Sequence, residues 1–356
     1  MNVYSAISSL GRIYGRIPVH TPFLRDWALP PLFLVLELTY RCNLSCPFCY
    51  LRPTETGGLD RPGDKELTSS EIESILDQTP PWTLVLLSGG EVLVRNDFSQ
   101  VLRTVVRKRR CHVFTNGTLL TPARAFEWVD LGVTSVAVSV EGPEAIHDLL
   151  RGAGTFGRTL AGIKSLVDYR AQKRKQRPLI NLKTTITIGN VTRLSESIRI
   201  AENLGVDYCT LQVLNTTARL GGRPLQAVLD YSGQPPAIRD FPLASLDQQL
   251  RKIERLARSS GIGVRLLPSL PIASILAHYS NTLQLSDYTC VSPWTVAYIS
   301  PYGDVYPCLN YLVGNVRDRS LRQLWNSRRY RLFRREILHR GLFPDCRGCC
   351  DLLRRD

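Results

Sequence analysis

The chain has 356 residues, of which 44% are apolar, so it is long enough for one large domain or two ordinary ones. It contains no apolar run of about eighteen residues and no signal-peptide pattern, which excludes a predicted transmembrane segment and export. Ten cysteines without an export signal indicate metal binding in the reducing cytoplasm, and the formal net charge of +14 adds the possibility of an anionic partner.

Residues 1–30 are expected to form an N-terminal arm, after which strand and helix patterns alternate. Ser69 or Ser70 followed by Glu71 begins the first helix with a capping box, and Gly132 and Gly205 mark the ends of two others. The strands are near-continuously apolar, which is typical of strands buried on both faces. They are expected at residues 31–38, 83–88, 111–115, 135–140, 180–188 and 208–214. The fold class is therefore α/β, with six βα units in a parallel sheet that is open or curled toward a barrel.

The regular alternation ends after Leu214. Residues 215–243 are rich in Gly, Pro and Arg and are expected to form a long loop, which is a candidate substrate lid. A helix over 243–261 and a short strand then complete a predicted barrel domain over 31–284. Residues 285–356 hold five of the ten cysteines and are expected to form a small metal-binding module.

Three cysteines, Cys42, Cys46 and Cys49, follow the first predicted strand with C-x3-C-x2-C spacing. They lie at the end of the sheet where α/β folds place their chemistry. A closed zinc site would need a fourth ligand, for which His20 and Cys111 are the candidates, and neither has a finger-like spacing. Three thiolates suit a [4Fe-4S] cluster in which one iron keeps an open coordination position.

The segment "CNLSCPFC", with Phe48 as its aromatic residue, resembles the C-x3-C-x-aromatic-C signature of the radical S-adenosylmethionine (SAM) superfamily. The resemblance covers about residues 32–214 and implies a partial (β/α)6 barrel. It further implies that SAM binds the open iron and is reductively cleaved to a 5′-deoxyadenosyl radical, which abstracts hydrogen from a substrate. In such an enzyme the cofactor supplies the chemistry and the protein positions it.

The same resemblance implies further SAM-binding residues at the ends of other strands. In the family that the chain resembles, the "GGE" segment binds the SAM amino group. That role suits glycines, which permit a close backbone approach, and a carboxylate, which accepts from an ammonium. By the match to the family, Ser139 contacts the ribose or carboxylate of SAM, and Arg151 pairs with its carboxylate. Gln212 and Val213 hold the adenine of SAM. Glu141 stands where the family more often has Asp. His147 and Asp148 are expected to cap and brace a helix. The cofactor-binding set is Phe48, Gly89, Gly90, Glu91, Ser139, Arg151 and Val213.

The C-terminal cysteines surround a predicted hairpin whose turn is 301–304, and four of them are enough for an iron–sulfur cluster or a zinc site. The segment resembles the SPASM extension of radical SAM maturases, in its shortened "twitch" form with one auxiliary [4Fe-4S] cluster. That resemblance gives the ligands as Cys290, Cys308, Cys346 and Cys349. Cys350 is a spare or exchanges with Cys349. Cys111 and Cys209 lie in strands and are expected to be core residues.

The leading hypothesis is a radical SAM oxidoreductase or maturase that performs a net oxidation or cross-link on a peptide, natural product or cofactor precursor. Its partners would be a peptide or small-molecule substrate and an electron donor such as flavodoxin or ferredoxin. The alternative is a non-catalytic iron–sulfur or zinc protein with a basic surface for nucleic acid or a membrane. Basic clusters at 105–110, 169–177 and 328–340 support that surface, but no nucleic-acid motif accompanies them, and exposed helix faces explain them better.

Overall fold

A curved sheet of ten strands organises the chain, whose computed structural model describes residues 14, 25–51, 63–217, 225–230, 240–308 and 311–355. The strand order is β11-β10-β9-β1-β2-β3-β4-β5-β6-β7. Strands β1 to β7 are all parallel, which confirms the predicted α/β partial barrel and adds β7 as a seventh parallel strand. Their bounds are β1 Phe33–Glu37, β2 Leu84–Ser88, β3 Arg110–Thr115, β4 Ser135–Ser139, β5 Leu179–Thr185, β6 Tyr208–Gln212 and β7 Gly263–Leu267.

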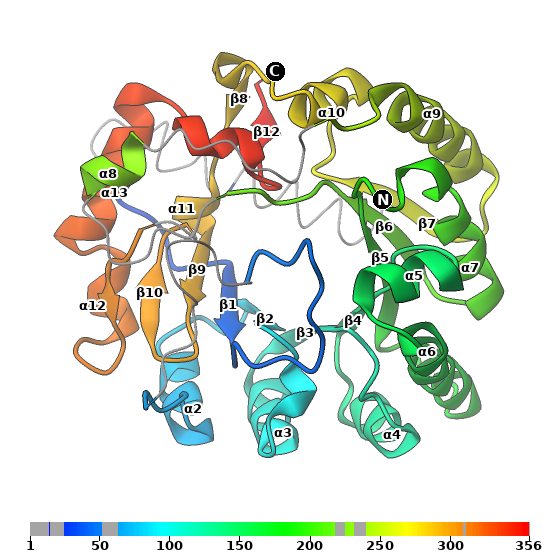
Figure 1. The fold of residues 1–356 in the computed structure, drawn as a ribbon. Helices are drawn as coiled ribbons and strands as arrows, with labels where there is room; N and C mark the ends of the chain where they lie inside the picture. The colour runs from blue at the N-terminus through cyan, green and yellow to red at the C-terminus, as the bar shows by residue number, and fades with distance from the viewer. Residues whose placement is uncertain are drawn as a thin grey trace.

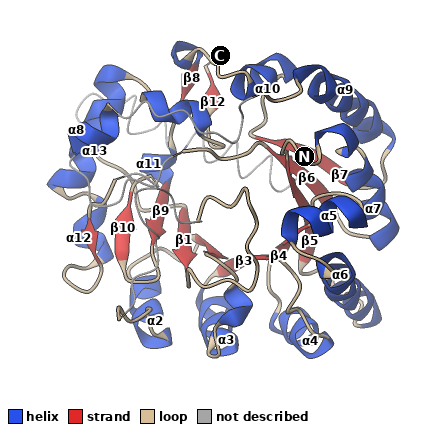
Figure 2. Cartoon of the chain, in the orientation of Figure 1, coloured by secondary structure: helices blue, strands red, loops and turns tan. Residues whose placement is uncertain are grey.

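Helices cover the convex side of this sheet (Figures 1 and 2). The first begins at the cap Thr68, whose side chain accepts from the Glu71 N–H, so the capping box lies one residue before the predicted Ser69. Gly132 and Gly205 end their helices in the left-handed conformation, as predicted. The helices are α2 Ser69–Asp77, α3 Phe98–Lys108, α4 Pro122–Leu131, α5 Glu144–Arg151, α6 Thr155–Gln172, α7 Glu196–Leu204, α9 Leu243–Ser259 and α10 Ile272–Tyr279.

The concave face of the sheet is more polar than the strand patterns predicted. On β5, Ile180 and Leu182 are fully buried in the hydrophobic core beneath the helices. Lys183 and Thr185, which alternate with them, are only half-buried and face the other side. The prediction that both strand faces are apolar was therefore wrong for this strand, because its inner face lines the partly open side of the barrel.

The predicted C-terminal hairpin exists, and it continues the same sheet. β9 (Val296–Ile299) pairs in parallel with β1, β10 (Asp304–Tyr306) returns antiparallel to β9, and β11 (Gly314–Asn315) follows. The domain boundary at 284/285 stays a prediction, and the sheet is continuous across it. The C-terminal helices are α11 Ser292–Thr295, α12 Leu321–Trp325 and α13 Arg328–Arg340.

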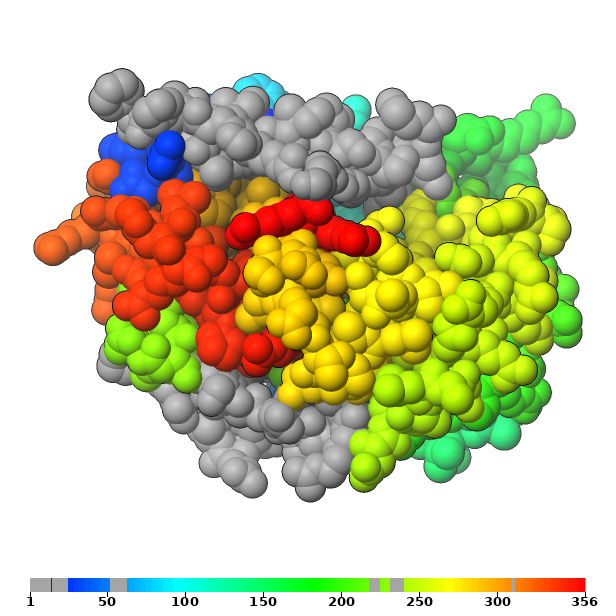
Figure 3. All heavy atoms as spheres, turned by 90° about the horizontal axis from the view of Figure 1, so that it is seen from above, coloured from blue at the N-terminus to red at the C-terminus, as the bar shows by residue number. Residues whose placement is uncertain are grey.

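A second, two-stranded sheet joins the end of the chain to the segment before the hairpin. β12 (Leu353–Arg354) pairs antiparallel with β8 (Tyr288–Thr289), and Leu352 packs there with Leu283. Figure 3 shows the red C-terminal residues lying against this golden segment. Of the proposed lid 215–243, residues 218–224 and 231–239 lie outside the described residues, and α8 (Leu225–Leu229) forms between them. Within the described ranges, no helix has the length and apolarity that crossing a membrane requires.

Buried Arg334 ties the C-terminal helices to the segment 25–30. Its guanidinium donates to the carbonyls of Pro293, Trp325 and Asp26 and to the Asn326 side chain, at 2.8 to 3.2 Å. The side chain has no exposed surface. Four acceptors from three segments therefore depend on one cation.

We expect Arg334→Ala to lower the free energy of unfolding by about 3 kcal/mol, because the substitution leaves several buried acceptors without a donor. Denaturant unfolding under anaerobic conditions measures this change. The control is Arg329→Ala, because Arg329 is exposed on the same helix. Equal stability of the two variants would contradict this reading of Arg334.

Candidate active site

The first three cysteines lie in the loop after β1, at the carboxyl edge of the parallel strands (Figure 1). Cys46 is buried, Cys49 is half-buried and Cys42 is exposed. The Leu44 N–H points to the Cys42 sulfur at 3.4 Å, and the Asn116 amide lies 3.9 Å from the same sulfur. Such donors favour a thiolate, which is the form that binds iron.

The "GGE" segment holds this loop through its backbone. The Gly90 N–H donates to the Thr39 carbonyl at 2.7 Å, and the Glu91 N–H donates to the Arg41 carbonyl at 3.0 Å. A Cβ on Gly89 would lie 2.3 Å from the Thr39 oxygen, and one on Gly90 would lie 2.2 Å from the Arg41 oxygen. Both positions therefore require glycine because the cysteine loop passes so close to them.

The Glu91 carboxylate is fully buried behind the loop. It accepts from the Leu93 N–H at 3.1 Å, the Thr115 hydroxyl at 2.7 Å and the Asn116 N–H at 2.7 Å. Burial raises the pKa of Glu91, although these donors oppose the shift. Glu91 thus joins β2 to the end of β3, and its contact with the SAM amino group stays a prediction.

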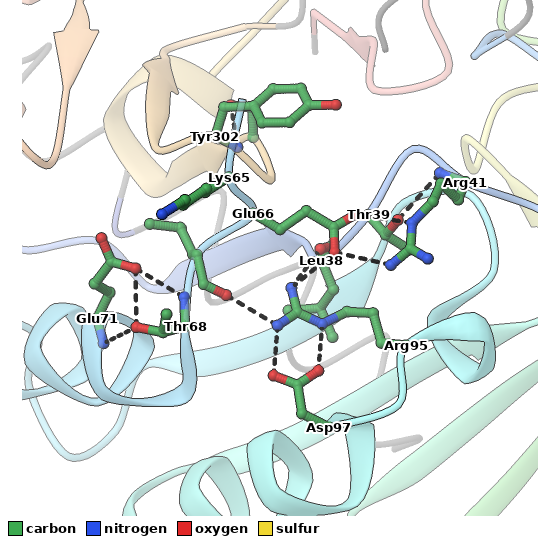
Figure 4. Close-up of polar contacts among 12 residues, drawn as sticks. Leu38, Thr39, Arg41, Lys65, Glu66, Thr68, Glu71, Arg95, Asp97 and Tyr302 are labelled. Carbon is green, nitrogen blue, oxygen red and sulfur yellow. Dashed lines mark hydrogen bonds and ion pairs between the residues drawn. The ribbon is translucent and has the colours of Figure 1, made fainter. Parts of the chain in front are cut away.

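Arg95 is a further brace of the cysteine loop, shown in Figure 4. Its nearly buried guanidinium donates to the Leu38 carbonyl at 2.7 Å, to the Leu67 carbonyl at 2.9 Å and to Asp97 through two bonds. Glu66, which also pairs with Arg41, lies 3.7 Å from Arg95. The start of the loop is therefore fixed against the segment that leads into α2.

A buried ion pair lies beside the second cysteine. Arg151, at the end of α5, donates to Glu141 at 2.6 and 2.9 Å, and Glu141 also accepts from the Thr185 N–H at 2.8 Å. Another guanidinium nitrogen lies 3.8 Å from the Cys46 sulfur, and the Phe48 ring centroid is 5.5 Å from the guanidinium carbon. Burial works to lower the pKa of Arg151, but the charges of Glu141 and Cys46 outweigh it and raise the pKa. The pair keeps a positive charge next to the predicted SAM-binding iron.

The other predicted SAM contacts lie at the carboxyl ends of β4 and β6. Ser139 and Gln212 are half-buried there. Val213 is 2% exposed in the core, and its N–H donates to the Leu267 carbonyl. His147 and Asp148 brace helices as predicted, since His147 accepts from the Glu141 N–H and Asp148 accepts from the N–H groups of Gly154 and Phe156.

The C-terminal cysteines lie close enough together for their charges to act on one another. Burial raises the pKa of four of these thiols, Cys290, Cys346, Cys349 and Cys350. For Cys346 the negative charges of Cys308 and Cys290 add to this rise, and for Cys349 those of Asp351, Cys350 and Cys290 do so. Each ionised thiol makes its neighbours harder to ionise, because like charges repel. The thiols can become thiolates together only when a positive metal centre offsets that repulsion.

The adjacent Cys349 and Cys350 differ in their surroundings. The Cys349 sulfur accepts from the Asp351 N–H at 3.3 Å, whereas the Cys350 thiol donates to the Asp351 carboxylate at 3.9 Å. Asp351 also accepts from the Tyr298 hydroxyl at 3.1 Å. This arrangement supports Cys349 as the ligand and Cys350 as the spare, and the assignment stays a prediction.

The donor sets fit iron–sulfur clusters, since three thiolates leave one iron open and four close a cube. Within the ranges that the structure describes, no three His, Cys, Asp or Glu side chains surround a single metal-ion position. A cluster does not require such a group, because each thiolate binds a different iron. Cys111 and Cys209 are buried within β3 and β6, as predicted for core residues.

Sequence reasoning missed several residues of the site. Asn116 follows the recognised end of β3 and contacts both Cys42 and, at 3.0 Å, Asn43. Arg95 had no signal beyond being a charge near the end of a strand. Lys183 was visible in the "INLKTT" alternation, in which every second residue is polar.

Two family descriptions match the chain: "Radical SAM superfamily" over residues 36–191 and the SPASM "Iron-sulfur cluster-binding domain" over residues 290–350. The pre-heme d1 synthase of Dinoroseobacter shibae is 32% identical over 314 residues, which are 84% of this chain and 74% of that protein. The AdoMet-dependent heme synthase of Methanosarcina barkeri is 28% identical over 312 residues, covering 83% and 82% respectively.

The fold is also similar to solved structures. Streptococcus suis SuiB, in its complex with the precursor peptide SuiA, superposes with a TM-score of 0.65 at 15% identity. The match covers 98% of this chain and 76% of SuiB. This likeness supports the predicted fold class. The two family descriptions support the predicted cofactor set of SAM and iron–sulfur clusters.

Proposed function

The chain belongs to the radical SAM superfamily and carries its SPASM iron–sulfur domain, and from this premise we propose that it catalyses a net oxidation or cross-link at an unactivated C–H position. The product would be a matured cofactor, natural product or peptide. The observation that carries this proposal is that two cysteine sets face one concave sheet, with the Glu141–Arg151 pair beside the first and Asp351 beside the second.

In this proposal Cys42, Cys46 and Cys49 hold the SAM-binding [4Fe-4S] cluster. The auxiliary [4Fe-4S] cluster is held by Cys290, Cys308, Cys346 and Cys349. When bound, SAM and the reduced cluster supply one-electron chemistry that removes a hydrogen atom from the substrate. The chain's own contribution is to orient both groups and to exclude water around them.

Several side chains have proposed roles in that orientation. Arg151 offers a fixed guanidinium to the SAM carboxylate while Glu141 holds it in place. The N–H groups of Leu44 and Asp351 stabilise the thiolates of Cys42 and Cys349, which tunes the potentials of the two clusters. Cys290, Cys308, Cys346 and Cys349 would hold the auxiliary cluster, which would supply the one-electron capacity that a net two-electron oxidation needs.

The partners follow from the same proposal. The names of the heme-related relatives favour a cofactor precursor as substrate, and the SuiB complex keeps a peptide as the other candidate. A flavodoxin or ferredoxin in the cytoplasm would supply the electron. No described helix could span a membrane.

We expect anaerobic reconstitution to load about eight irons per chain, as two [4Fe-4S] clusters. Dithionite should then cause slow cleavage of SAM to 5′-deoxyadenosine. Replacing Cys42, Cys46 and Cys49 together by Ala should leave about four irons and no SAM cleavage. Iron analysis and chromatography of the nucleoside measure these outcomes. Bound zinc, or full iron content in the triple variant, would refute the proposal.

A further inference from the structure

Lys183 lies on the concave face of the sheet, in a row that crosses four strands. It is in register with Ser139 on β4 and Thr210 on β6, and Thr210 is in register with Arg265 on β7. Its neighbours Leu182 and Thr184 are fully buried on the opposite face. The half-buried Lys183 side chain therefore points toward the side of the sheet that carries both cysteine sets.

The surroundings of Lys183 connect the two sites. Burial lowers the pKa of Lys183, while the negative charges of Cys350, Glu141 and Asp351 oppose that shift and Arg151 adds to it. Glu141 and Arg151 belong to the first site, and Cys350 and Asp351 to the second. Groups from both sites thus lie close enough to Lys183 to act on its charge.

The ammonium of Lys183 makes no hydrogen bond or ion pair to any residue in the described part of the chain. Instead, the ammonium lies over the Phe114 ring, 4.8 Å from its centroid. A cation–π contact contributes about 0.5–2 kcal/mol, which offsets only part of the cost of removing a charge from water. A lysine that serves only to cover Phe114 would be replaceable by an apolar residue at this position.

We propose that Lys183 is a substrate-binding residue and that the substrate carries a carboxylate, which pairs with the Lys183 ammonium between the two cysteine sets. The inference rests on the proposed function and deepens it, because it names the chemical class of the substrate. A substrate bound at Lys183 lies within reach of both sites. Ser139, which flanks Lys183 on β4, adds a hydroxyl group beside the same position, whereas the Thr210 hydroxyl on β6 donates to Asn181.

The test uses the anaerobically reconstituted protein and a matched pair of probes, glutarate and its neutral analogue glutaramide. Calorimetry at low ionic strength should detect glutarate and not glutaramide. Lys183→Met, which keeps the length of the side chain without its charge, should weaken glutarate binding at least about tenfold. Lys183→Arg should retain most of the binding, since it keeps the positive charge. Lys164→Ala is the control, because Lys164 is 69% exposed on α6.

Three results would overturn the inference. The first is equal glutarate affinity in the wild type and Lys183→Met. The others are wild-type protein that binds glutaramide as tightly as glutarate, and wild-type protein that does not bind glutarate. Iron content and thermal unfolding of each variant show whether it is folded. Cleavage of SAM by the wild-type protein is scored separately. If the wild-type protein does not cleave SAM, the proposed function is wrong. If it cleaves SAM but Lys183→Met binds glutarate as tightly as the wild type does, this inference alone is wrong.

Discussion

Gly90→Ala is expected to abolish iron loading at the first cysteine set, so that the reconstituted variant carries about four irons per chain rather than eight. The added Cβ would lie 2.2 Å from the Arg41 carbonyl oxygen and 2.9 Å from that of Tyr40. Both neighbours are backbone atoms, which cannot rotate away as the end of a side chain can. The loop that carries Cys42 must therefore move, and the Glu91 N–H would lose its bond to Arg41.

The matched control is Gly157→Ala. A Cβ on Gly157, within α6, meets no atom within 4 Å, so this substitution should leave the iron content unchanged. It should also stabilise the helix slightly, because alanine loses less backbone entropy than glycine does. Iron analysis and the cluster absorbance measure both variants. Full iron loading in Gly90→Ala would show that the close packing of the two loops is not required.

Local motifs made the first site predictable from the sequence. Cys42, Cys46 and Cys49 lie within eight residues, and "GGE" directly follows a strand, so a short window contains each signal. The sequence could also predict helices such as α2, because its capping box is local. Gly89 and Gly90 were predicted to approach a ligand, whereas the structure shows that they first approach the backbone of the cysteine loop.

Features that depend on long-range register could not be predicted. Parallel pairing of β9 with β1 joins residues more than 250 positions apart, and no periodicity reveals it. Arg95 reaches Leu38 and Leu67 only because the strands fix where their loops lie. Lys183 was overlooked for another reason: its strand shows a polar alternation, but the apolar residues in it led to the interpretation that both faces are buried. The role proposed for Lys183 can be inferred only from the structure, which places its side chain on the open side of the curved sheet.

Arg151→Ala is expected to reduce SAM affinity strongly and to destabilise the protein by about 3–5 kcal/mol. Removing the guanidinium leaves the fully buried Glu141 carboxylate without its cation. The Thr185 N–H still donates to its other oxygen at 2.8 Å. It also removes the positive charge 3.8 Å from the Cys46 sulfur. Because burial already raises the pKa of Cys46 and Arg151 opposes that rise, the loss should also disfavour the thiolate.

The double variant Glu141→Gln with Arg151→Met separates these two effects. It removes the buried charges together, so it should recover much of the lost stability, since replacing a whole buried pair is often nearly neutral. It should not recover SAM affinity, because no guanidinium remains to pair with the SAM carboxylate. Denaturant unfolding and equilibrium binding of SAM measure the two properties independently. If the double variant recovered both, Arg151 would act only as the partner of Glu141, and its proposed contact with SAM would be wrong.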